Sequence, residues 1–256
     1  MEVVSQENVI NIAIDADSLI FKACYRHQVP GGVDIELAYL EFCYEIGKIR
    51  SAVFRIVDVA KDEKVIPLIV LSPKKTFRND LSMDYKANRP AKLMHGIKQL
   101  KYIVMDRLKQ WALVVPNVEA DDVVIYYAKH HNYLVSAIDK DVTSVCPTSC
   151  YNYNYRRWEY GVPAYAVETW YAKQALMGDS TDGISGADNI GKVGAQKWVD
   201  KYEGTLFSWH DFVEKFGHEI IAEQTMNLIR MDGLQMINNQ LVWKPWNIYE
   251  SQYWEF

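Results

Sequence analysis

The chain has 256 residues, of which 49% are hydrophobic and 24% are charged, and this composition is typical of a globular protein. It contains no low-complexity segment, and no apolar run reaches the length of a membrane-spanning helix, so we expect no membrane association. The start, Met1 to Ser5, lacks the basic flank of a signal peptide, so we expect a cytoplasmic location.

Hydrophobic periodicity predicts alternating strands and helices over the first 140 residues or so. The expected strands are 9–14, 65–71, 112–115 and 133–138, and the expected helices are 19–27, 36–60, 93–111 and one that begins near residue 120. Ser18 is placed to cap the first helix. Alternation at this rhythm is typical of a mainly parallel sheet flanked by helices, so the predicted fold class is α/β.

The remaining chain is predicted to be mostly helical. Residues 151–160 alternate aromatic and polar side chains, as a small edge hairpin does, and a helix follows from Pro163 to Met177. After a glycine-rich stretch, an aromatic tail that ends near Trp254 is expected to pack back on the body. We therefore expect two domains: an α/β core over residues 1–160 that includes a basic segment at 74–110, and a helical region over 161–256 with a hairpin between helices at about 184–200.

Acidic residues gather where an α/β fold would bring them together. Asp15, Asp139 and Asp141 directly follow predicted strands, and the carboxyl ends of parallel strands share one edge of a sheet. Residues 119–122 add three carboxylates in a first helical turn, where the helix dipole favours negative charge. A solvated helix terminus would have the same pattern, but three crowded carboxylates repel one another unless a cation neutralises them.

A basic segment follows the second predicted strand. Residues 74–109 hold ten Lys and Arg against three Asp, a net charge of +7 in a chain whose net charge is −5. Residues 74–91 show no apolar periodicity, so we expect an exposed loop there. A basic stretch beside acids that hold metal suits a polyphosphate substrate, although a solvated basic face gives the same pattern.

Part of this pattern resembles the haloacid-dehalogenase phosphatases. The matching segments are Ile14-Asp15-Ala16-Asp17 and Gly178-Asp179-Ser180-Thr181-Asp182, and in that family the first Asp is a nucleophile and the second a general acid. The family places its Gly-Asp motif after a strand, whereas residues 169–177 are predicted to be helical here. The phosphatase interpretation also leaves the acids at 119–122 and 139–141 without a role.

The full ordered set of motifs resembles the 5′-nuclease family: flap endonucleases, the 5′-nuclease domain of DNA polymerase I and bacteriophage 5′–3′ exonucleases. In chain order the matching segments are Ile14-Asp15, Phe77-Arg78, Asp84 to Arg89, Glu119-Ala120-Asp121-Asp122, Asp139-Lys140-Asp141, Gly178-Asp179 with Asp182, and the glycine hairpin Gly186 to Ala195. Each segment is weakly specific alone, and their order carries the resemblance. The chain is most similar to the phage enzymes, because it is compact.

The resemblance implies phosphodiester hydrolysis by two divalent ions, Mg²⁺ or Mn²⁺, held by carboxylates. It assigns Asp15, Glu119 and Asp121 to the first ion, and Asp139, Asp141, Asp179 and Asp182 to the second, with Asp122 close to both. The family usually has an Asp at the end of the second strand, where this chain has Ser72. Either Asp17 substitutes for it, or the first ion is held more weakly and Asp17 only caps its helix. Without the other motifs, the acids at 179 and 182 would be ordinary turn residues.

The same resemblance assigns residues to DNA. Lys86 and Arg89 match a basic catalytic pair that holds the scissile phosphate. Phe21 matches an aromatic residue that stacks on a base, although core packing is equally expected of a Phe. The other expected DNA contacts are Arg78, Tyr85, Gly186, Gly191, Lys192, Gly194 and Lys197, the last five in a helix–hairpin–helix that holds K⁺ in family members.

The implied function is that of a monomeric, magnesium-dependent 5′–3′ exonuclease that also cuts flaps or nicks in duplex DNA and removes primer RNA from RNA/DNA hybrids during replication. Backbone contacts carry no sequence information, so the expected selectivity is for structure. The short basic arch argues against a closed hole around a threaded strand. Two alternatives stay open: a phosphatase that uses Asp15 as its nucleophile, and a DNA-binding protein made catalytically weak by Ser72. For a phage protein, the expected location is the host cytoplasm.

Overall fold

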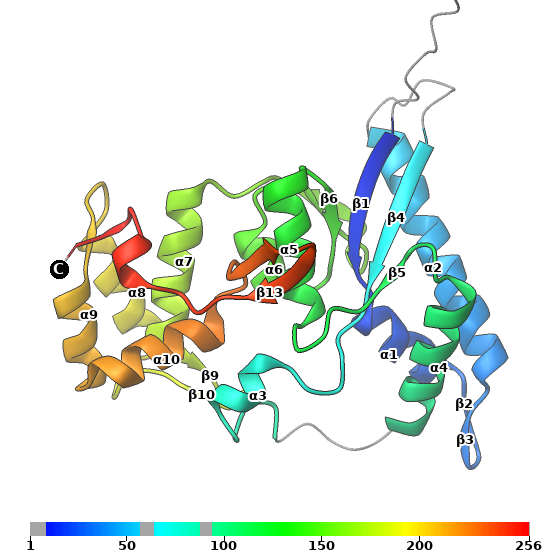
Figure 1. The fold of residues 1–256 in the computed structure, drawn as a ribbon, viewed down its shortest axis with the longest axis horizontal. Coiled ribbons are helices and arrows are strands. Elements are labelled where there is room, and N and C mark those ends of the chain that lie inside the picture. Colours follow the sequence, from blue (N-terminus) through cyan, green and yellow to red (C-terminus); the bar gives the residue numbers. More distant parts are fainter. Residues whose placement is uncertain (1–8, 57–63, 88–93, 256) are drawn as a thin grey trace, which may run out of the picture. The chain divides into compact units, whose positions relative to one another are not determined.

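The computed structural model describes residues 9–56, 64–87 and 94–255 (Figure 1). The chain divides into two compact units. The first comprises Met1–Pro73 and Ala91–Gly161, and the second comprises Lys74–Pro90 and Val162–Phe256. Across the described ranges, no helix has the length and apolarity needed to cross a membrane.

A six-stranded sheet forms the centre of the first unit. Its strand order is β5-β4-β1-β6-β7-β8, and every neighbouring pair is parallel except β7 with β8. The strands are β1 Val9–Asp15, β4 Lys64–Val70, β5 Ala112–Leu113, β6 Leu134–Ser136, β7 Cys150–Asn152 and β8 Arg157–Glu159. The predicted α/β class, the mainly parallel sheet and the edge hairpin are confirmed. Asp15 pairs with Val70, so β1 and β4 end together at one edge of the sheet.

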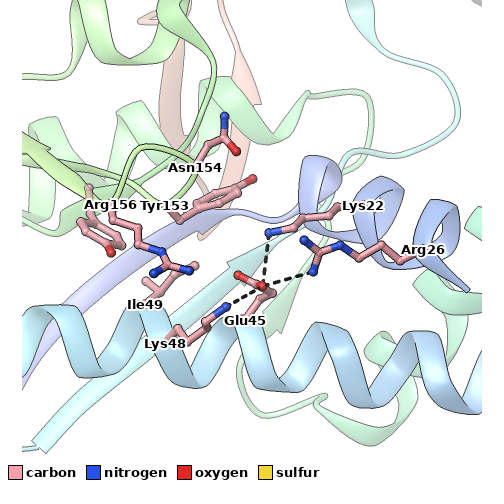
Figure 2. Close-up of a pocket in the computed structure, with 9 residues that line it drawn as sticks. Lys22, Arg26, Glu45, Lys48, Ile49, Tyr153, Asn154 and Arg156 are labelled. Atoms are coloured by element: carbon pink, nitrogen blue, oxygen red, sulfur yellow. Dashed lines mark hydrogen bonds and ion pairs between the residues drawn. The ribbon is translucent and has the colours of Figure 1, made fainter.

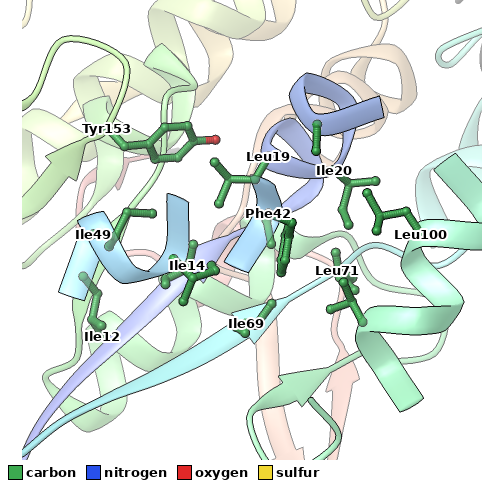
Figure 3. Packing of buried hydrophobic residues seen from close by; sticks show 14 of the residues in the cluster. Ile12, Ile14, Leu19, Ile20, Phe42, Ile49, Ile69, Leu71, Leu100 and Tyr153 are labelled. Atoms are coloured by element: carbon green, nitrogen blue, oxygen red, sulfur yellow. The ribbon is translucent and has the colours of Figure 1, made fainter. Parts of the chain in front are cut away.

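Helices flank this sheet, and the alternation of side chains along β1 explains why. Ile12 and Ile14 point into a hydrophobic core that also contains side chains of α1, α2 and α4 (Figure 3). Because side chains alternate along a strand, Ala13 points to the opposite face of the sheet. α5 contacts β1, β4 and β6. The helices are α1 Asp17–Arg26, α2 Ile35–Ile56, α4 Met94–Arg107, α5 Ala120–His131 and α6 Lys140–Val145, and β2 Gln28–Val29 pairs with β3 Gly32–Val33 between α1 and α2.

The start of α1 differs from the prediction. Ser18 does not cap the helix, because the helix begins at Asp17 and the cap residue is Ala16. Asp15 Oδ1 instead accepts a hydrogen bond from the Asp17 backbone nitrogen at 3.2 Å, so the acid that ends β1 also organises the turn into α1. The predicted extension of α2 to residue 60 and the predicted start of α4 at residue 93 lie outside the described residues.

The second unit is mainly helical. α7 contacts both α8 and α10, and α10 also contacts α9 and α3. Its elements are α3 Phe77–Leu81, α7 Ala164–Met177, β9 Gly178–Asp179, β10 Ile184–Ser185, α8 Lys192–Asp200, β11 Phe207–Ser208, α9 Trp209–Phe216, α10 Glu219–Ile229, β12 Leu234–Ile237, β13 Gln240–Trp243, the 3₁₀ helix η1 Ile248–Glu250 and β14 Trp254–Glu255. The predicted helix before Gly178 is confirmed.

Aromatic side chains form the core near the C-terminal end of this unit. The Trp254 ring centroid lies 5.0 Å from that of Phe212 and 5.2 Å from that of Phe207, which confirms that the aromatic tail packs back. The expectation of helix throughout the rest of the chain is wrong for β12 and β13, which form an antiparallel hairpin. Its turn residues Asn238 and Asn239 both adopt positive φ, as the two-residue turns typical of hairpins require.

The predicted basic loop is not simply an exposed loop. It contains α3, whose Phe77 ring stacks on Trp243 with centroids 4.0 Å apart. Arg78 is only 2% exposed, and its guanidinium donates hydrogen bonds to the carbonyls of Leu228 at 2.8 Å and Arg230 at 2.7 Å. These partners lie 150 and 152 residues further along the chain, so local periodicity could not predict the burial.

Candidate active site

Asp15 is the most enclosed acid at the carboxyl edge of the sheet. Its residue is 4% exposed because β1 is flanked by β4 and β6 and the turn into α1 folds over it. Burial raises the pKa of Asp15, the charges of Asp17 and Asp139 raise it further, and Lys101 opposes them; the resulting pKa is about 7. This carboxylate therefore stands in an excess of negative potential that a bound cation would relieve.

Asp17 has a different environment, although it lies two residues away. Its carboxylate contacts Lys101 Nζ at 2.5 Å and accepts hydrogen bonds from the Ser72 backbone nitrogen at 3.3 Å. Lys101 also donates to the Ser72 carbonyl at 3.0 Å, and the Ser72 hydroxyl accepts from the Ala120 nitrogen at 2.9 Å. Asp17 does not cap α1 with its side chain, so that alternative is wrong. The Asp17 carboxylate links the residue after β4 to α1, and the Lys101 ammonium group neutralises its charge.

The carboxylates that precede and begin α5 lie against the sheet. Glu119 is the cap residue, and both Glu119 and Asp122 are buried, whereas Asp121 is half-buried. The alternative of a solvated helix terminus is therefore wrong for Glu119 and Asp122. Ala120 follows Glu119 and donates its backbone N–H to the Ser72 hydroxyl, so the start of α5 is fastened to the residues that follow β4.

Asp139 and Asp141 follow β6 as predicted. Asp139 is exposed, caps α6, and accepts a hydrogen bond from the Asp141 nitrogen at 2.8 Å. The Asp139 charge contributes to the raised pKa of Asp15, so the acids that follow β1 and β6 lie close enough to interact. The first unit thus carries acids from β1, from the α5 start and from the α6 start, at the edge where parallel strands gather reactive groups.

The donor set fits a hard divalent cation, since every candidate ligand is a carboxylate oxygen. The described residues do not include a group of three or more His, Cys, Asp or Glu side chains already arranged to hold a metal ion. A bound cation would relieve the repulsion from Asp17 and Asp139 that contributes to the raised pKa of Asp15.

Two further predicted ligands and Lys86 come together within the second unit. Asp179 Oδ1 accepts hydrogen bonds from the nitrogens of Thr181 and Asp182, so it does shape the turn between β9 and β10. Lys86 Nζ lies 3.8 Å from Asp182 Oδ2, and the Lys86 nitrogen donates to the Asp182 carbonyl at 2.9 Å. A Cβ on Gly183 would lie 2.3 Å from the Asp84 carbonyl oxygen, so this approach requires glycine. Arg89, the predicted partner of Lys86, lies outside the described residues.

The predicted DNA contacts divide into exposed and buried residues. Phe21 is 52% exposed on α1, so the core-packing alternative is wrong for it. Tyr85 is buried beneath Lys86, whose Nζ lies 4.9 Å from the ring centroid. The burial of Tyr85 and Arg78 contradicts the DNA contacts predicted for them. Both side chains instead anchor the basic segment within the second unit.

The residues of the predicted glycine hairpin also differ in exposure. Gly191, Lys192, Gly194 and Lys197 are exposed around the start of α8, and nothing lies within 4 Å of a Cβ placed on Gly191. Gly186 differs, because a Cβ there would lie 2.4 Å from the backbone of Met177. Close packing against the end of α7 therefore explains the glycine at 186.

Sequence patterns missed Lys101. It lies within the basic segment, and no local pattern indicates that α4 brings it to the ends of β1 and β4. The Ser72 hydroxyl was likewise seen only as a missing carboxylate, whereas it accepts the first hydrogen bond at the start of α5.

Comparison with known proteins identifies the family. The family model described as "5′-3′ exonuclease, N-terminal resolvase-like domain" matches residues 11–172, more than half of the chain. The chain belongs to the 5′–3′ exonuclease family. A 5′–3′ exonuclease of Buchnera aphidicola subsp. Baizongia pistaciae is 25% identical over 237 residues, covering 83% of this chain and 73% of that protein.

Solved structures share the fold. The D15 protein of T5, co-crystallised with metal ions, superposes with a TM-score of 0.64 at 17% identity, over 86% of this chain and 89% of that one. The bacteriophage T5 D15 flap endonuclease in a pseudo-enzyme–product complex with DNA and metal ions superposes with a TM-score of 0.59 at 17% identity, over the same shares. At 17% identity, these superpositions show that the fold is shared.

Family membership confirms the predicted 5′-nuclease function and makes the chain a member of a hydrolase family. It does not favour the phosphatase alternative or the catalytically weak binding protein. The structure also argues against the phosphatase alternative, because the helix α7 precedes Gly178-Asp179, where the phosphatase pattern requires a strand.

Proposed function

We propose that this exonuclease family member uses two divalent metal ions, Mg²⁺ in the cell, to hydrolyse phosphodiesters near the 5′ ends of duplex DNA. The observation that supports this most directly is the buried Asp15 carboxylate, which stands among like charges at the carboxyl edge of the sheet. A buried carboxyl with a raised pKa in such a place is typical of a functional site.

The first unit would hold metal through Asp15, Glu119, Asp121, Asp122, Asp139 and Asp141. A bound ion would lower the pKa of a water and stabilise charge on the phosphate oxygens. The protein supplies the remaining parts of the reaction: carboxylates that fix the ions, and a turn into α1 that keeps Asp15 out of water. Asp17 is not needed as a substitute ligand in this proposal, because Lys101 already neutralises it.

The second unit would contribute Asp179 and Asp182 to metal binding, and Lys86 with Arg89 to the scissile phosphate. The contact between Lys86 and Asp182 supports a shared role for these two side chains. An ammonium group held by a ligand carboxylate is well suited to neutralise charge that develops on a phosphate during hydrolysis.

DNA would be recognised by its structure. The exposed residues around the start of α8 would donate backbone amides to phosphates in a helix–hairpin–helix, with a K⁺ ion at the same place, and Phe21 would stack on a base. The T5 D15 flap endonuclease was solved with DNA and metal ions, which supports the same classes of ligand here. Flaps, nicks and primer RNA in a hybrid would be substrates of one monomer.

One assay separates this function from its alternatives. The protein is incubated with 5′-labelled nicked duplex, with and without Mg²⁺, beside a chromogenic phosphate monoester. We expect nucleotide release that depends on Mg²⁺ and stops with a chelator, and no monoester hydrolysis. Hydrolysis of the monoester alone would favour the phosphatase, and tight binding of the duplex without cutting would favour the catalytically weak protein.

A further inference from the structure

A basic cavity lies in the first unit. It has a volume of about 190 Å³ and lies between α1, α2 and the turn that joins β7 to β8 (Figure 2). Four cationic side chains line it: Lys22 and Arg26 from α1, Lys48 from α2 and Arg156 from the hairpin turn. Among the residues that the structure describes, Glu45 is the one carboxylate that lines the same cavity. The cavity therefore carries an excess of positive charge.

The buried carboxylate organises three of these cations. Glu45 is 4% exposed, and its Oε1 lies 2.9 Å from Lys48, 3.2 Å from Lys22 and 3.8 Å from Arg26. Arg26 also pairs with Glu41 outside the cavity. Even when Glu41 is counted, four cations face two acids, which leaves a net charge of +2. Glu45 thus positions three of the four cations, and the site keeps an excess of two positive charges.

The fourth cation is held by an unusual backbone. Arg156 adopts a positive φ of 54°, a conformation that side chains other than glycine, asparagine and aspartate rarely take. The turn is fixed by Asn152 Oδ1, which accepts hydrogen bonds from the nitrogens of Asn154 and Tyr155, each at 3.1 Å. This turn places Arg156 at the cavity instead of leaving it on a mobile surface loop.

The outer face of α1 shows which kind of anion suits the cavity. Phe21 and Tyr25 are 52% and 63% exposed, and their rings stack with centroids 6.2 Å apart. They alternate along the helix with Lys22 and Arg26. Exposed aromatic rings next to cations are the combination that binds single strands, since bases stack while phosphates meet the charges.

Position along α1 relates the cavity to the cut. Lys22 and Arg26 come seven and eleven residues after Asp15 in the sequence. Since α1 begins at Asp17, a rise of 1.5 Å per helical residue places them about 8–14 Å along the helix from its start, which is the length of about two to four nucleotides at a rise of 3.4 Å. One face of a single helix can therefore carry a strand from the metal-binding edge to the cavity.

We propose that the cavity formed by Lys22, Arg26, Lys48 and Arg156 binds a phosphate group of the nucleic-acid substrate, a few nucleotides from the phosphodiester that is cut. This proposal rests on the proposed nuclease function and adds a second anion site to it. The phosphate is either the terminal monoester at a 5′ end or a diester within the strand. Both have the chemistry that the cavity selects, and substrates with different ends distinguish them.

The test uses the full chain and two conservative variants, Lys48→Gln and Arg156→Gln. Both side chains reach solvent, so their replacement leaves the core intact. The matched control is Arg55→Gln, an exposed cation on the same helix as Lys48 but outside the cavity. Steady-state cleavage is measured on one duplex carrying a 5′-phosphate, a 5′-hydroxyl or a long 5′ extension. Affinity for the same DNAs is measured without metal by fluorescence anisotropy.

We expect each cavity variant to raise KM and Kd by roughly tenfold with kcat retained, and to reduce the salt dependence of binding by about one charge. An effect confined to the 5′-phosphate substrate identifies the terminal monoester, and an equal effect on all three identifies an internal diester. Cavity variants indistinguishable from Arg55→Gln in Kd would overturn the proposal. Kd is measured without catalysis. A protein that binds DNA without cutting it would therefore refute the nuclease function, and its Kd values would still test the cavity.

Discussion

Replacing Asp15 with asparagine removes one charge from the buried end of β1 and keeps the size of the side chain. Burial, together with the charges of Asp17 and Asp139, raises the pKa of Asp15 from 3.8 to about 7. Since the folded-state pKa lies above the unfolded value, the stability that this carboxyl contributes is present below pH 3.8 and is lost as the pH rises through 7. A rise from 3.8 to about 7 corresponds to about 4 kcal/mol of unfolding free energy.

The Asp15→Asn variant should therefore be more stable than the parent protein at pH 8 in the absence of metal, by up to about 4 kcal/mol, and the difference should shrink as the pH falls toward 4. For a chain of this size, 1 kcal/mol shifts Tm by roughly 2–4 °C. Thermal unfolding followed by circular dichroism at pH 5 and pH 8 measures both effects. Added Mg²⁺ should raise the Tm of the parent protein, because a ligand that binds only the folded state stabilises it, and should raise that of the variant much less.

Asp17→Asn is the matched control for this experiment. Its carboxylate is paired with Lys101 at 2.5 Å, so neutralising it should lower the stability of the metal-free protein slightly, by about 1 kcal/mol or less. The two variants differ by two positions and should change Tm in opposite directions. A metal-free Asp15→Asn protein less stable than its parent at pH 8 would refute the reasoning, since it would mean that Asp15 already has a compensating partner.

Three further substitutions test other parts of the structure. Phe21→Ala should weaken DNA binding by about 1–3 kcal/mol in anisotropy titrations and change unfolding free energy by less than about 0.5 kcal/mol; the reverse pattern would mean a packing role. Lys86→Ala should lower kcat at least about a hundredfold with little change in KM, whereas the exposed Lys75→Ala should not, and unchanged turnover would remove Lys86 from the catalytic group. Glu168→Gln should cost about 2 kcal/mol in urea denaturation, because the buried Arg230 guanidinium loses the carboxylate that it contacts at 2.6 Å and keeps that of Asp232 at 2.9 Å; a loss below about 0.5 kcal/mol would contradict this account.

The α/β core was predictable because its signals are local. The run that ends at Asp15 is apolar from Ile12 to Ile14 because β1 is buried on both sides there, and the start of α5 is marked by apolar residues at helical spacing. The order β5-β4-β1-β6-β7-β8 was not predictable in this way, because it depends on which strands pair across the sheet. The local signals place the acids at strand ends, so the edge that carries them was predictable before the contacts between them were.

Other features depend on partners that are distant in sequence. Arg78 reads as a surface cation in a basic segment, yet it is buried because two carbonyls about 150 residues away accept its hydrogen bonds. Lys101 is one of ten cations in that segment, and only the packing of α4 shows that it neutralises Asp17. The hairpin of β12 and β13 depends on positive φ at two asparagines, and most of its strand residues are exposed. Hydrophobic periodicity predicts burial where a helix or strand has a continuous buried face. Arg78, Lys101 and the hairpin of β12 and β13 do not lie on such a face.

The most direct test of the metal-binding account is crystallographic. Crystals of the protein soaked in Mn²⁺ would be measured at a wavelength where manganese scatters anomalously. The account predicts an anomalous peak within about 2.3 Å of a carboxylate oxygen of Asp15, a usual distance for oxygen ligands of such ions. Manganese bound only at other surfaces, with the Asp15 carboxylate in contact with no ion, would contradict it.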